Sequence, residues 1–532
     1  MAVADLVLMN GKIVTVDKDF SFRKAVAVKD GWIIDTGYDA DIRQYVGPKT
    51  EVIDLKGKMV LPGAHDAHTH CVQYGVSNPP ISLDLRYPAV TCIKDMRELL
   101  AKAVREKPPG TWIKGVGWQP GYMEECRNDP NFLPRKKDLD DISPDHPVLF
   151  LDFSLHFLVV NSKALAICGV TKDTPNPSAG EIERDENGEP TGVFKEFEAQ
   201  NFIMRHLPQL TEEERKTAIR YAQRKMNENG STSYNESSLG PGGNHFFGGC
   251  LGEAPIYTYK AMQDAGELTC RVNVGLLMGE YGTSRYEDVA RGLEAFKKPE
   301  ITDSNWFDVT MLKIFGDGLP NAHTAWLWDD YENKAGWHGR ACVPGVSDEE
   351  MAEELNKIVL LAHSNGYQVG IHAVGDQTID RSLDAFIAAM NAYPGKTPRH
   401  YIIHGDCITN RWARKAARYD VGLSLQPAIG AFIYDVNAEF IGKRASRTYG
   451  LKELIGAGIN VAGGSDCPCV PPVWLKALET AVTRKSDVTG EEHCPELAIS
   501  LEQGIRIFTM GGAYQEQKER VRGSVEIGKV AD

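Results

Sequence analysis

The sequence lacks any apolar run close to the roughly 20 residues needed to cross a bilayer. Its first ten residues, MAVADLVLMN, also lack the basic region, apolar core and cleavage site of a secretory leader. Basic residues are outnumbered, with 59 Lys and Arg against 73 Asp and Glu, for a net charge of −14. This balance argues against sequence-independent nucleic-acid binding and polybasic attachment to a membrane. We therefore expect a cytoplasmic protein with neither partner.

The sequence also lacks a cysteine pattern that indicates disulfide bonds. The eleven cysteines are odd in number and contain no C-x-x-C pair, so we expect reduced thiols in a reducing compartment. Cys467 and Cys469 form a C-x-C beside Asp466, which leaves metal ligation by a thiol as a minor alternative. No G-x-G-x-x-G follows any strand that the pattern predicts, which disfavours a dinucleotide-binding, doubly wound sheet.

The chain of 532 residues exceeds one ordinary domain of about 100–200 residues, although a barrel with insertions can use this length. Hydrophobic residues make up 42% and charged residues 25%, the composition of a globular protein. Residues 1–62 are rich in Val and Ile and are punctuated by Asn10-Gly11 and Asp30-Gly31. These dipeptides are typical of two-residue hairpin turns. We predict a small β domain here.

From His65 onward, strand-like segments alternate with amphipathic helices. One helix is predicted from a capping box of Ser347 with Glu350 to a C-terminal stop at Gly366, with an apolar face at every third or fourth position. Eight parallel strands with intervening helices predict an α/β protein with a (β/α)8 barrel over 63–520. The stretch from about 75 to 205 separates the first two strands and is predicted to be an inserted subdomain. The eight predicted strands are Ala64–His70, Ser231–Glu236, Arg271–Met278, Phe307–Phe315, Tyr367–His372, His400–His404, Val421–Gln426 and Asn460–Asp466.

Residues that can bind metal fall at the ends of these strands. His68 and His70 lie at i and i+2 of the first strand, so both imidazoles point to one side. Imidazole is a good ligand for zinc and similar divalent metals. Because barrel active sites lie at the C-terminal ends of the strands, other ligand-type residues there would meet this pair. These residues are His372, His404 and Asp466, together with Lys313 inside an unusually apolar strand.

Each of these residues alone has a simpler explanation. His372 or His404 could be a satisfied core or surface histidine, and Lys313 could belong to a structural ion pair. Asp466 could cap the next helix. The occurrence of such ligand-type residues on five different strands favours a metal site. His65, Asp66 and His323 lie nearby in the sequence, and we expect them outside the ligand set.

The segment Leu61-Pro-Gly-Ala-His-Asp-Ala-His-Thr-His70 resembles the opening of the barrel in the amidohydrolase superfamily, and the resemblance covers nearly the whole chain. Within that superfamily the sequence is most similar to the YtcJ-like branch, which includes N-substituted formamide deformylases. The finer match rests on Gly117-Trp118, His156 with Asn161 and Ala164-Leu165, Gly180–Arg184 running to Gly188–Gly192, Lys313-Ile-Phe-Gly-Asp-Gly318, His372-Ala-Val-Gly-Asp376 and Gly464-Ser-Asp-Cys-Pro468.

The chain departs from the family pattern in two places. Residues 521–532 resemble the family's return into the small β-sandwich domain, but family members run on past Val-Ala-Asp532. Either the chain is shortened or its small sheet is smaller. The family often has Gly-Ser-Leu-Gly-Ser after the lysine motif, whereas this chain has Gly318-Leu-Pro-Asn-Ala322, which bears on substrate preference.

The resemblance implies that His68, His70, Lys313, His372, His404 and Asp466 are ligands of one or two divalent metal ions, with zinc the favoured metal. Lys313 would be carboxylated to N6-carboxylysine and bridge two metals. A metal-bound hydroxide would attack the substrate carbonyl, and Asp466 would carry a proton to the leaving group. His404 or His156 would stabilise the oxyanion.

The expected activity is hydrolysis of a non-peptide C–N bond in a small N-substituted amide. Many aromatic residues lie in the insert and the loops, and most of them are expected to pack internally. Any that line the mouth would favour an apolar or aromatic substrate, with Trp118, Trp326 and His156 as the candidate contacts. The aromatic residues in question are Trp118, Tyr122, Phe153, Phe157, Phe246, Phe247, Trp326 and Trp328.

Three alternatives stay open. A mononuclear deaminase of a heterocyclic ring generally has a carboxylate acid near strand five and no bridging lysine, whereas here Asp376 follows His372 and Lys313 is present. The same metal-bound hydroxide would also hydrolyse esters or lactones. A non-catalytic binding protein on this fold predicts lost ligands, and none of the six is missing. A homodimer is expected, because large barrels of this kind often form one.

Overall fold

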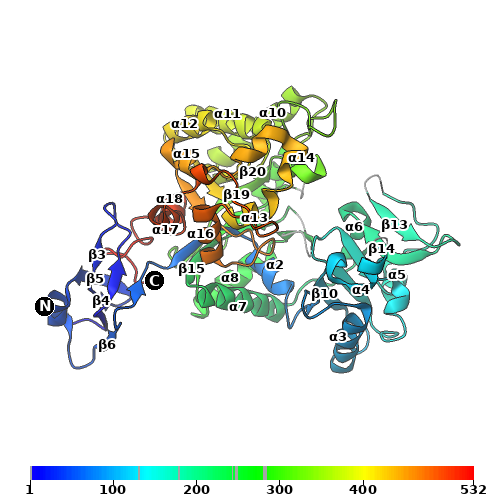
Figure 1. Cartoon of the computed structure of the whole chain (residues 1–532), viewed down its shortest axis with the longest axis horizontal. Helices are drawn as coiled ribbons and strands as arrows, with labels where there is room; N and C mark the ends of the chain where they lie inside the picture. The colour runs from blue at the N-terminus through cyan, green and yellow to red at the C-terminus, as the bar shows by residue number, and fades with distance from the viewer. Residues whose placement is uncertain (1–2, 130–131, 178–179, 243, 246–249, 280–283) are drawn as a thin grey trace. The chain divides into compact units, whose positions relative to one another are not determined.

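The computed structural model describes residues 3–129, 132–177, 180–242, 244–245, 250–279 and 284–532. The chain forms two compact units (Figure 1). We call the first the barrel unit, which comprises Met1–His70, Gln223–Gly243 and Gly252–Asp532. The second, the insert unit, comprises Cys71–Ala222 and Asn244–Leu251. Among the described residues, no helix is both long and apolar enough to cross a membrane.

The barrel unit is built on an eight-stranded parallel sheet, and the predicted (β/α)8 fold is confirmed. Every predicted barrel strand is present, with ends that differ by at most a few residues. In sheet order the strands are β23 (Val461–Gly463), β22 (Gly422–Leu425), β21 (Tyr401–His404), β20 (Gln368–Ala373), β19 (Phe307–Phe315), β18 (Arg271–Leu276), β15 (Ser231–Leu239) and β8 (Ala64–Thr69).

Short hydrogen bonds join the two ends of this sheet. The Asp466 amide, beyond β23, donates to the His68 carbonyl oxygen of β8 at 2.7 Å. The His70 amide donates to the Cys467 carbonyl oxygen at 2.9 Å. The first and last strands of the barrel are therefore tied together at their C-terminal ends, where active sites of this fold lie.

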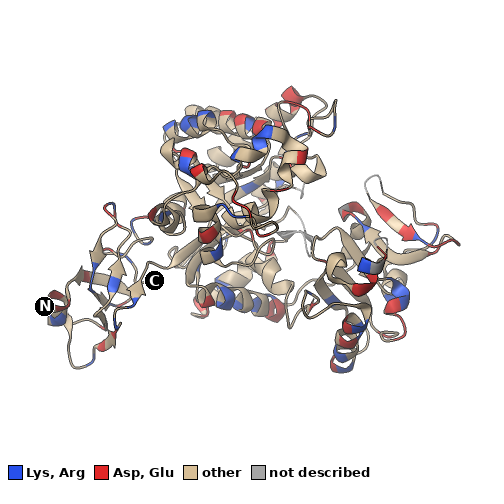
Figure 2. Cartoon of the chain, viewed as in Figure 1, with Lys and Arg blue, Asp and Glu red and all other residues tan. Residues whose placement is uncertain are grey.

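Helices follow the strands on the outside of the barrel and carry many charged side chains (Figure 2). Most barrel strands are buried on both faces and largely apolar, but β8 and β15 bury many polar side chains. The helices are α7 (Glu212–Glu228), α8 (Ala254–Asp264), α9 (Tyr286–Ala295), α10 (Asp348–Ser364), α11 (Asp376–Ala392), α12 (Asn410–Arg418), α13 (Pro427–Ile433), α14 (Asn437–Ile441), α15 (Leu451–Gly456), α16 (Trp474–Thr483), α17 (Leu501–Ile507) and α18 (Met510–Gln515).

The predicted boundaries of α10 are confirmed. Ser347 is the N-cap, and its hydroxyl oxygen accepts from the Glu350 amide at 3.2 Å. The predicted capping box is incomplete, because the Glu350 carboxylate accepts from the Val346 amide and not from the Ser347 amide. Gly366 has a φ of +85°, the left-handed conformation that ends helices and favours glycine.

The N-terminal segment forms two small sheets. One has the order β5-β4-β1-β6 and the other β3-β2-β7. Asp30-Gly31 joins antiparallel β4 and β5, as predicted. Residues 528–531 form backbone hydrogen bonds with Gly31 and Ile33. The elements are β1 (Leu6–Met9), β2 (Lys12–Val14), β3 (Phe22–Arg23), β4 (Ala25–Lys29), β5 (Trp32–Gly37), α1 (Asp39–Ile42), β6 (Glu51–Asp54) and β7 (Met59–Val60).

The hairpin predicted at Asn10-Gly11 is wrong, because β1 and β2 belong to different sheets. The Gly11 amide instead donates to the Lys24 carbonyl oxygen. A Cβ atom at Gly11 would lie only 2.2 Å from Leu55 Cδ1, so glycine allows the chain to cross closely from one sheet to the other. Asn10 has a φ of +56°. The dipeptide thus reflects positive φ and close packing rather than a hairpin turn.

The insert unit has a six-stranded sheet of order β13-β14-β12-β11-β10-β9. A turn at Asp185–Gly188 joins β13 to β14. Its elements are α2 (Cys71–Val76), β9 (Leu83–Asp84), α3 (Ile93–Glu106), β10 (Ile113–Trp118), α4 (Glu124–Asn128), β11 (Val148–Asp152), β12 (Phe157–Val160), α5 (Ser162–Cys168), β13 (Glu181–Arg184), β14 (Pro190–Lys195), α6 (Phe197–Met204), β16 (Asn244–His245) and β17 (Cys250–Leu251).

A buried histidine pair joins α10 to the residue before β21. The Val369 amide donates to His400 Nδ1 at 2.9 Å, and the Tyr393 carbonyl oxygen accepts from His363 Nε2. His400 must therefore donate through Nε2 to His363 Nδ1, at 2.9 Å. Neither ring keeps a free lone pair for another proton. Burial, together with the neighbouring His363, lowers the pKa of His400 to about 3.

This pair predicts a loss of stability in mild acid. Below pH about 6.5 the unfolded chain binds a proton at His400 and the folded chain does not, until the pH approaches about 3. Folding stability should fall by about 1.4 kcal/mol per pH unit from this group. His400→Gln should be less stable than the wild type at pH 7.5 but should lose less stability on acidification.

The measurement is denaturant unfolding of both proteins between pH 7.5 and 4.5. His206→Gln, at an exposed histidine, serves as the control and should follow the wild type. An unchanged slope in His400→Gln would show that the pair does not bear the acid sensitivity.

Candidate metal centre

Three of the predicted ligands lie within reach of a single ion. His68 is on β8, His70 follows it, and Asp466 lies in the loop after β23. The Asp466 Oδ1 atom is 3.4 Å from His68 Nε2 and 3.3 Å from His70 Nε2. One ligand atom from each residue lies within 4.8 Å of the others. Tetrahedral zinc with bonds of about 2.0–2.2 Å holds its ligand atoms roughly 3.3 Å apart, which matches this spacing.

The loop that carries Asp466 is held tightly. The Asp66 carboxylate accepts from the Ser465 amide at 2.8 Å, and burial raises the pKa of Asp66 to about 7. Asp466 itself has a φ of +59°, and His404 has a φ of +72°. Left-handed backbone at such residues costs free energy and persists where the surroundings determine it, often at functional sites.

Lys313 on β19 lies beside His68, with Nζ 3.4 Å from His68 Nε2. The Nδ1 atom of His68 lies 2.9 Å from Ser237 Oγ, while Nε2 faces both Lys313 and Asp466. The nitrogen that faces Lys313 and Asp466 is therefore the one free to bind metal. Sequence reasoning missed Ser237, because a serine within a strand carries no distinguishing signal.

His372 on β20 and His404 on β21 complete the cluster. Their ring centroids are 4.4 Å apart, and the centroid of His404 is 5.6 Å from that of His68. His372 Nδ1 lies 3.3 Å from Asp317 Oδ1. The structure thus gathers all six predicted residues, while their roles as ligands stay a prediction. The cluster consists of His68, His70, Lys313, His372, His404 and Asp466.

The electrostatics suit metal binding. Burial and the nearby Lys313 hold the pKa of His68 well below its usual value, and burial and His372 do the same for His404. Burial would raise the pKa of Asp466, but a hydrogen bond from His70 and the charges of its neighbours lower it overall. Neutral imidazoles beside an ionised carboxylate are the protonation states that metal ligands need.

The chemistry of the donor set also fits a divalent metal. Several imidazoles and one carboxylate around a common point form the ligand set that zinc and similar ions prefer. Neither Cys467 nor Cys469 belongs to the group of three among the residues described.

Comparison with known proteins agrees with this geometry. Residues 51–532 match the family model described as "Amidohydrolase family". The chain belongs to this amidohydrolase family. The predicted resemblance is therefore confirmed.

Two curated relatives match nearly the whole amidohydrolase chain. It is 30% identical over 527 residues to the putative amidohydrolase YtcJ of Bacillus subtilis, covering 98% of this chain and 92% of the relative. It is 26% identical over 538 residues to an N-substituted formamide deformylase of Arthrobacter pascens, covering 99% and 92%. The crystal structure of an uncharacterized metal-dependent hydrolase from Pyrococcus furiosus has the same fold, with a TM-score of 0.76, 23% identity and coverage of 99% and 97%.

The predicted substrate contacts of the amidohydrolase lie in different surroundings. Trp326 is fully buried, and its indole N–H donates to Asp348 Oδ1 at 3.1 Å. Trp118 is fully buried in the core of the insert unit. His156, also in the insert unit, is exposed and pairs with Glu196 at 2.8 Å. Contact of these residues with substrate stays a prediction, and Phe246 and Phe247 lie outside the described residues.

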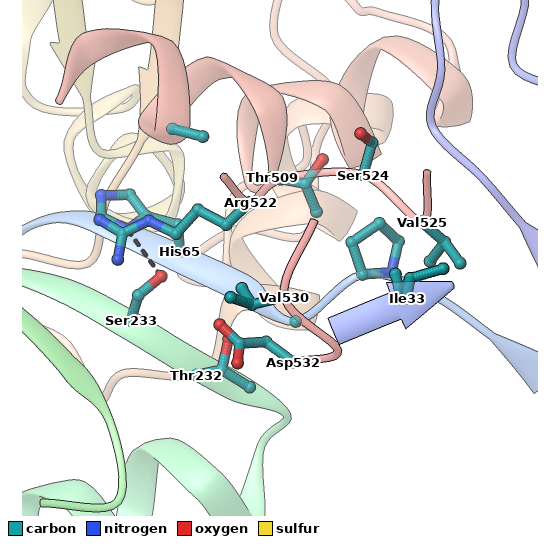
Figure 3. A pocket seen from close by; sticks show the side chains of 14 residues that line it. Ile33, His65, Thr232, Ser233, Thr509, Arg522, Ser524, Val525, Val530 and Asp532 are labelled. Carbon is teal, nitrogen blue, oxygen red and sulfur yellow. Dashed lines mark hydrogen bonds between the residues drawn. The ribbon is translucent and has the colours of Figure 1, made fainter. Parts of the chain in front are cut away.

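A small cavity lies on the helix side of β8 (Figure 3). Its volume of about 20 Å³ has room for about one water. His65 lines it and contacts α18, with Nε2 3.5 Å from Glu516 Oε1. His65 Nδ1 lies 2.9 Å from Ser233 Oγ. His65 is therefore outside the ligand cluster, as expected from the sequence.

Removal of His68 tests the cluster directly. His68→Ala should lower zinc affinity by more than the about 10–100-fold typical of residues that only orient a ligand. The affinity is measured by competition with a chromophoric chelator. His323→Gln is the matched control, because His323 bonds to Asn333 rather than to the cluster. Equal affinity of His68→Ala and the wild type would place the metal elsewhere.

Proposed function

We propose that this amidohydrolase binds one or two divalent metal ions, with zinc favoured, and hydrolyses the C–N bond of a small N-substituted amide. The observation that carries the proposal is the convergence of His68, His70 and Asp466 at the C-terminal end of the barrel. Membership of the amidohydrolase family supports hydrolysis, and the relative named N-substituted formamide deformylase supports an amide of this class.

A divalent ion bound to these residues would acidify a water molecule and polarise the scissile carbonyl group. The protein groups then have separate tasks. Asp466 carries an ionised carboxylate beside both histidines, so it can take a proton from the attacking water. The same carboxyl group can pass that proton to the departing amine. Its side chain is 12% exposed, so solvent reaches this proton carrier only in part.

His404 is the candidate for stabilising the oxyanion that forms during attack. Its imidazole is neutral, because burial and His372 lower its pKa, and a neutral ring has one N–H to donate. It lies against His372 and near His68, at the centre of the cluster. A prearranged donor in a buried site stabilises developing charge far better than water does. Removal of a single such donor commonly costs about 10²–10³-fold in rate.

Lys313 is the candidate for the bridging ligand. Lys313 is buried beside His68, and burying an ammonium group costs free energy. Addition of CO2 to the neutral amine, with loss of one proton, would convert Lys313 into an anionic carbamate. The carbamate would suit a position between two cations, which is why we propose N6-carboxylysine here.

The activity test uses zinc-loaded protein and a panel of N-formyl and N-acyl amines with aromatic or aliphatic substituents. The proposal expects release of the free amine with zinc and none after chelation. Heterocyclic amines and simple esters are assayed in parallel. Release of ammonia from a heterocyclic amine, with no amide hydrolysis, would replace the proposal with the deaminase alternative.

Asp466→Asn tests the proton carrier. The amide cannot accept and return a proton at this position, so kcat should fall by about 10²–10⁴-fold. Its remaining oxygen should keep most of the metal bound. Steady-state kinetics and elemental analysis measure the two effects, and Asp264→Asn on exposed α8 is the control. Turnover close to that of the wild type would remove Asp466 from this role.

Lys313→Ala tests the carbamate bridge. The variant should contain one metal fewer per chain, and short carboxylic acids should restore part of its activity by taking the place of the carbamate. Lys415→Ala is the control, since Lys415 pairs with Asp380 and Asp384 on the helices. Metal content is measured by elemental mass spectrometry, and an unchanged count would contradict the two-metal arrangement.

A further inference from the structure

Asp317 is a buried carboxylate that follows β19 and gathers hydrogen bonds from three parts of the barrel unit. Its side chain is 0% exposed. Both oxygens accept, and three of the donors are backbone amides, which can only donate. Oδ1 lies 3.3 Å from His372 Nδ1 and 3.0 Å from the Val374 amide. Oδ2 accepts from the amides of Trp326 and Gly375, at 3.1 and 2.8 Å, and from Thr378 Oγ1 at 2.6 Å.

These contacts determine which nitrogen of His372 carries the proton. A neutral imidazole has one N–H, and a carboxylate offers only acceptors. His372 must therefore donate through Nδ1, which leaves its lone pair on Nε2. A histidine ligand whose other nitrogen donates to a carboxylate is held in one orientation and is a more basic ligand.

The remaining contacts hold Asp317 itself in place. Gly375 is the N-cap of α11, and Thr378 lies in its first turn, so Asp317 satisfies donors at the start of this helix. The Trp326 amide belongs to the loop that follows β19. One carboxylate thus connects the end of β19, the end of β20 and the start of α11. It cannot turn away from His372 without leaving several buried amides unpaired.

We propose that Asp317 is a positioning residue of the metal centre, which holds His372 in the Nδ1–H tautomer and so presents Nε2 to the metal. This inference rests on the proposed function, because it requires metal at His372. It goes beyond the ligand set by assigning a role to a residue that touches neither metal nor substrate.

Asp317→Asn should disturb this arrangement in a defined way. Three donors surround Oδ2 and two surround Oδ1, so the single oxygen of the amide should turn toward Trp326, Gly375 and Thr378. The amide nitrogen would then face His372 Nδ1. His372 Nδ1 would then have to accept a hydrogen bond from the amide nitrogen. The imidazole proton would move to Nε2, where it blocks metal binding.

Thr378→Val is the matched control. It removes one donor from Oδ2 and loosens the start of α11, but it leaves the contact between Asp317 and His372 intact. If Asp317 only caps the helix, both variants should lose stability and neither should lose metal affinity. If Asp317 positions His372, only Asp317→Asn should bind metal more weakly.

The experiment measures zinc affinity by chelator competition for the wild type, Asp317→Asn, Thr378→Val, His372→Gln and the double variant D317N/H372Q. We expect Asp317→Asn to weaken binding about 10–100-fold and Thr378→Val to stay within about threefold of the wild type. In the His372→Gln background, Asp317→Asn should have no further effect.

Two results would overturn this inference but not the proposed function. One is a zinc affinity of Asp317→Asn within about threefold of that of a wild type that binds zinc. The other is that Asp317→Asn weakens zinc binding as much in the His372→Gln background as in the wild type. A wild-type chain that binds no zinc would overturn the proposed function as well. If Asp317→Asn does not fold, the tautomer of His372 is measured by NMR in metal-free wild type labelled with 15N-histidine. The His372 signal is identified as the one that is missing in His372→Gln. The Nδ1–H tautomer is expected, and an Nε2–H tautomer would contradict the proposal.

Discussion

The candidate metal centre depends on how the barrel closes. Two backbone hydrogen bonds tie the end of the first strand to the loop after the last, from Asp466 to His68 and from His70 to Cys467. The same residues supply the side chains that converge. The backbone contacts that close the sheet therefore also bring together ligands nearly 400 residues apart in the sequence. A change that loosens this closure would separate His68 and His70 from Asp466 before it affected the rest of the fold.

Burial gives these ligands their chemical character. It lowers the pKa values of His68 and His404, while neighbouring histidines keep Asp466 ionised. His68, His404 and Asp466 are thus in the protonation states that suit metal ligands. The Nδ1 atoms of His68 and His372 contact Ser237 Oγ and Asp317 Oδ1, and these contacts orient the Nε2 atoms. Loss of such support from surrounding residues commonly costs about 10–100-fold in metal affinity or activity.

The sequence predicts the barrel because strands alternate with amphipathic helices, and ligand-type residues recur where five of the strands end. All six predicted cluster residues stand out in this way. Ser237 does not, since nothing in one sequence distinguishes it from other buried serines. Asp317 lies in the Lys313–Gly318 motif, but its hydrogen-bond partners come from the end of β20, the start of α11 and the loop after β19. The sequence alone does not show that these segments meet.

Local sequence motifs are less reliable predictors where tertiary packing determines the backbone conformation or the burial of a side chain. Asn10-Gly11 favours positive φ, which it has, yet Leu55 and the neighbouring sheet turn it into a crossing rather than a hairpin. Trp118 and Trp326 were candidate substrate contacts because they are aromatic and lie in the insert and a loop. Both are fully buried, and aromatic character alone does not distinguish a core residue from a pocket wall.

The most direct test of the central claim is the metal content of the purified protein, measured by elemental mass spectrometry as isolated and again after zinc is supplied and the excess removed. The account predicts one or two bound divalent ions per chain, with two supporting a bridge through Lys313. A protein that retains no metal, even after zinc is supplied, would show that these side chains do not form a metal centre.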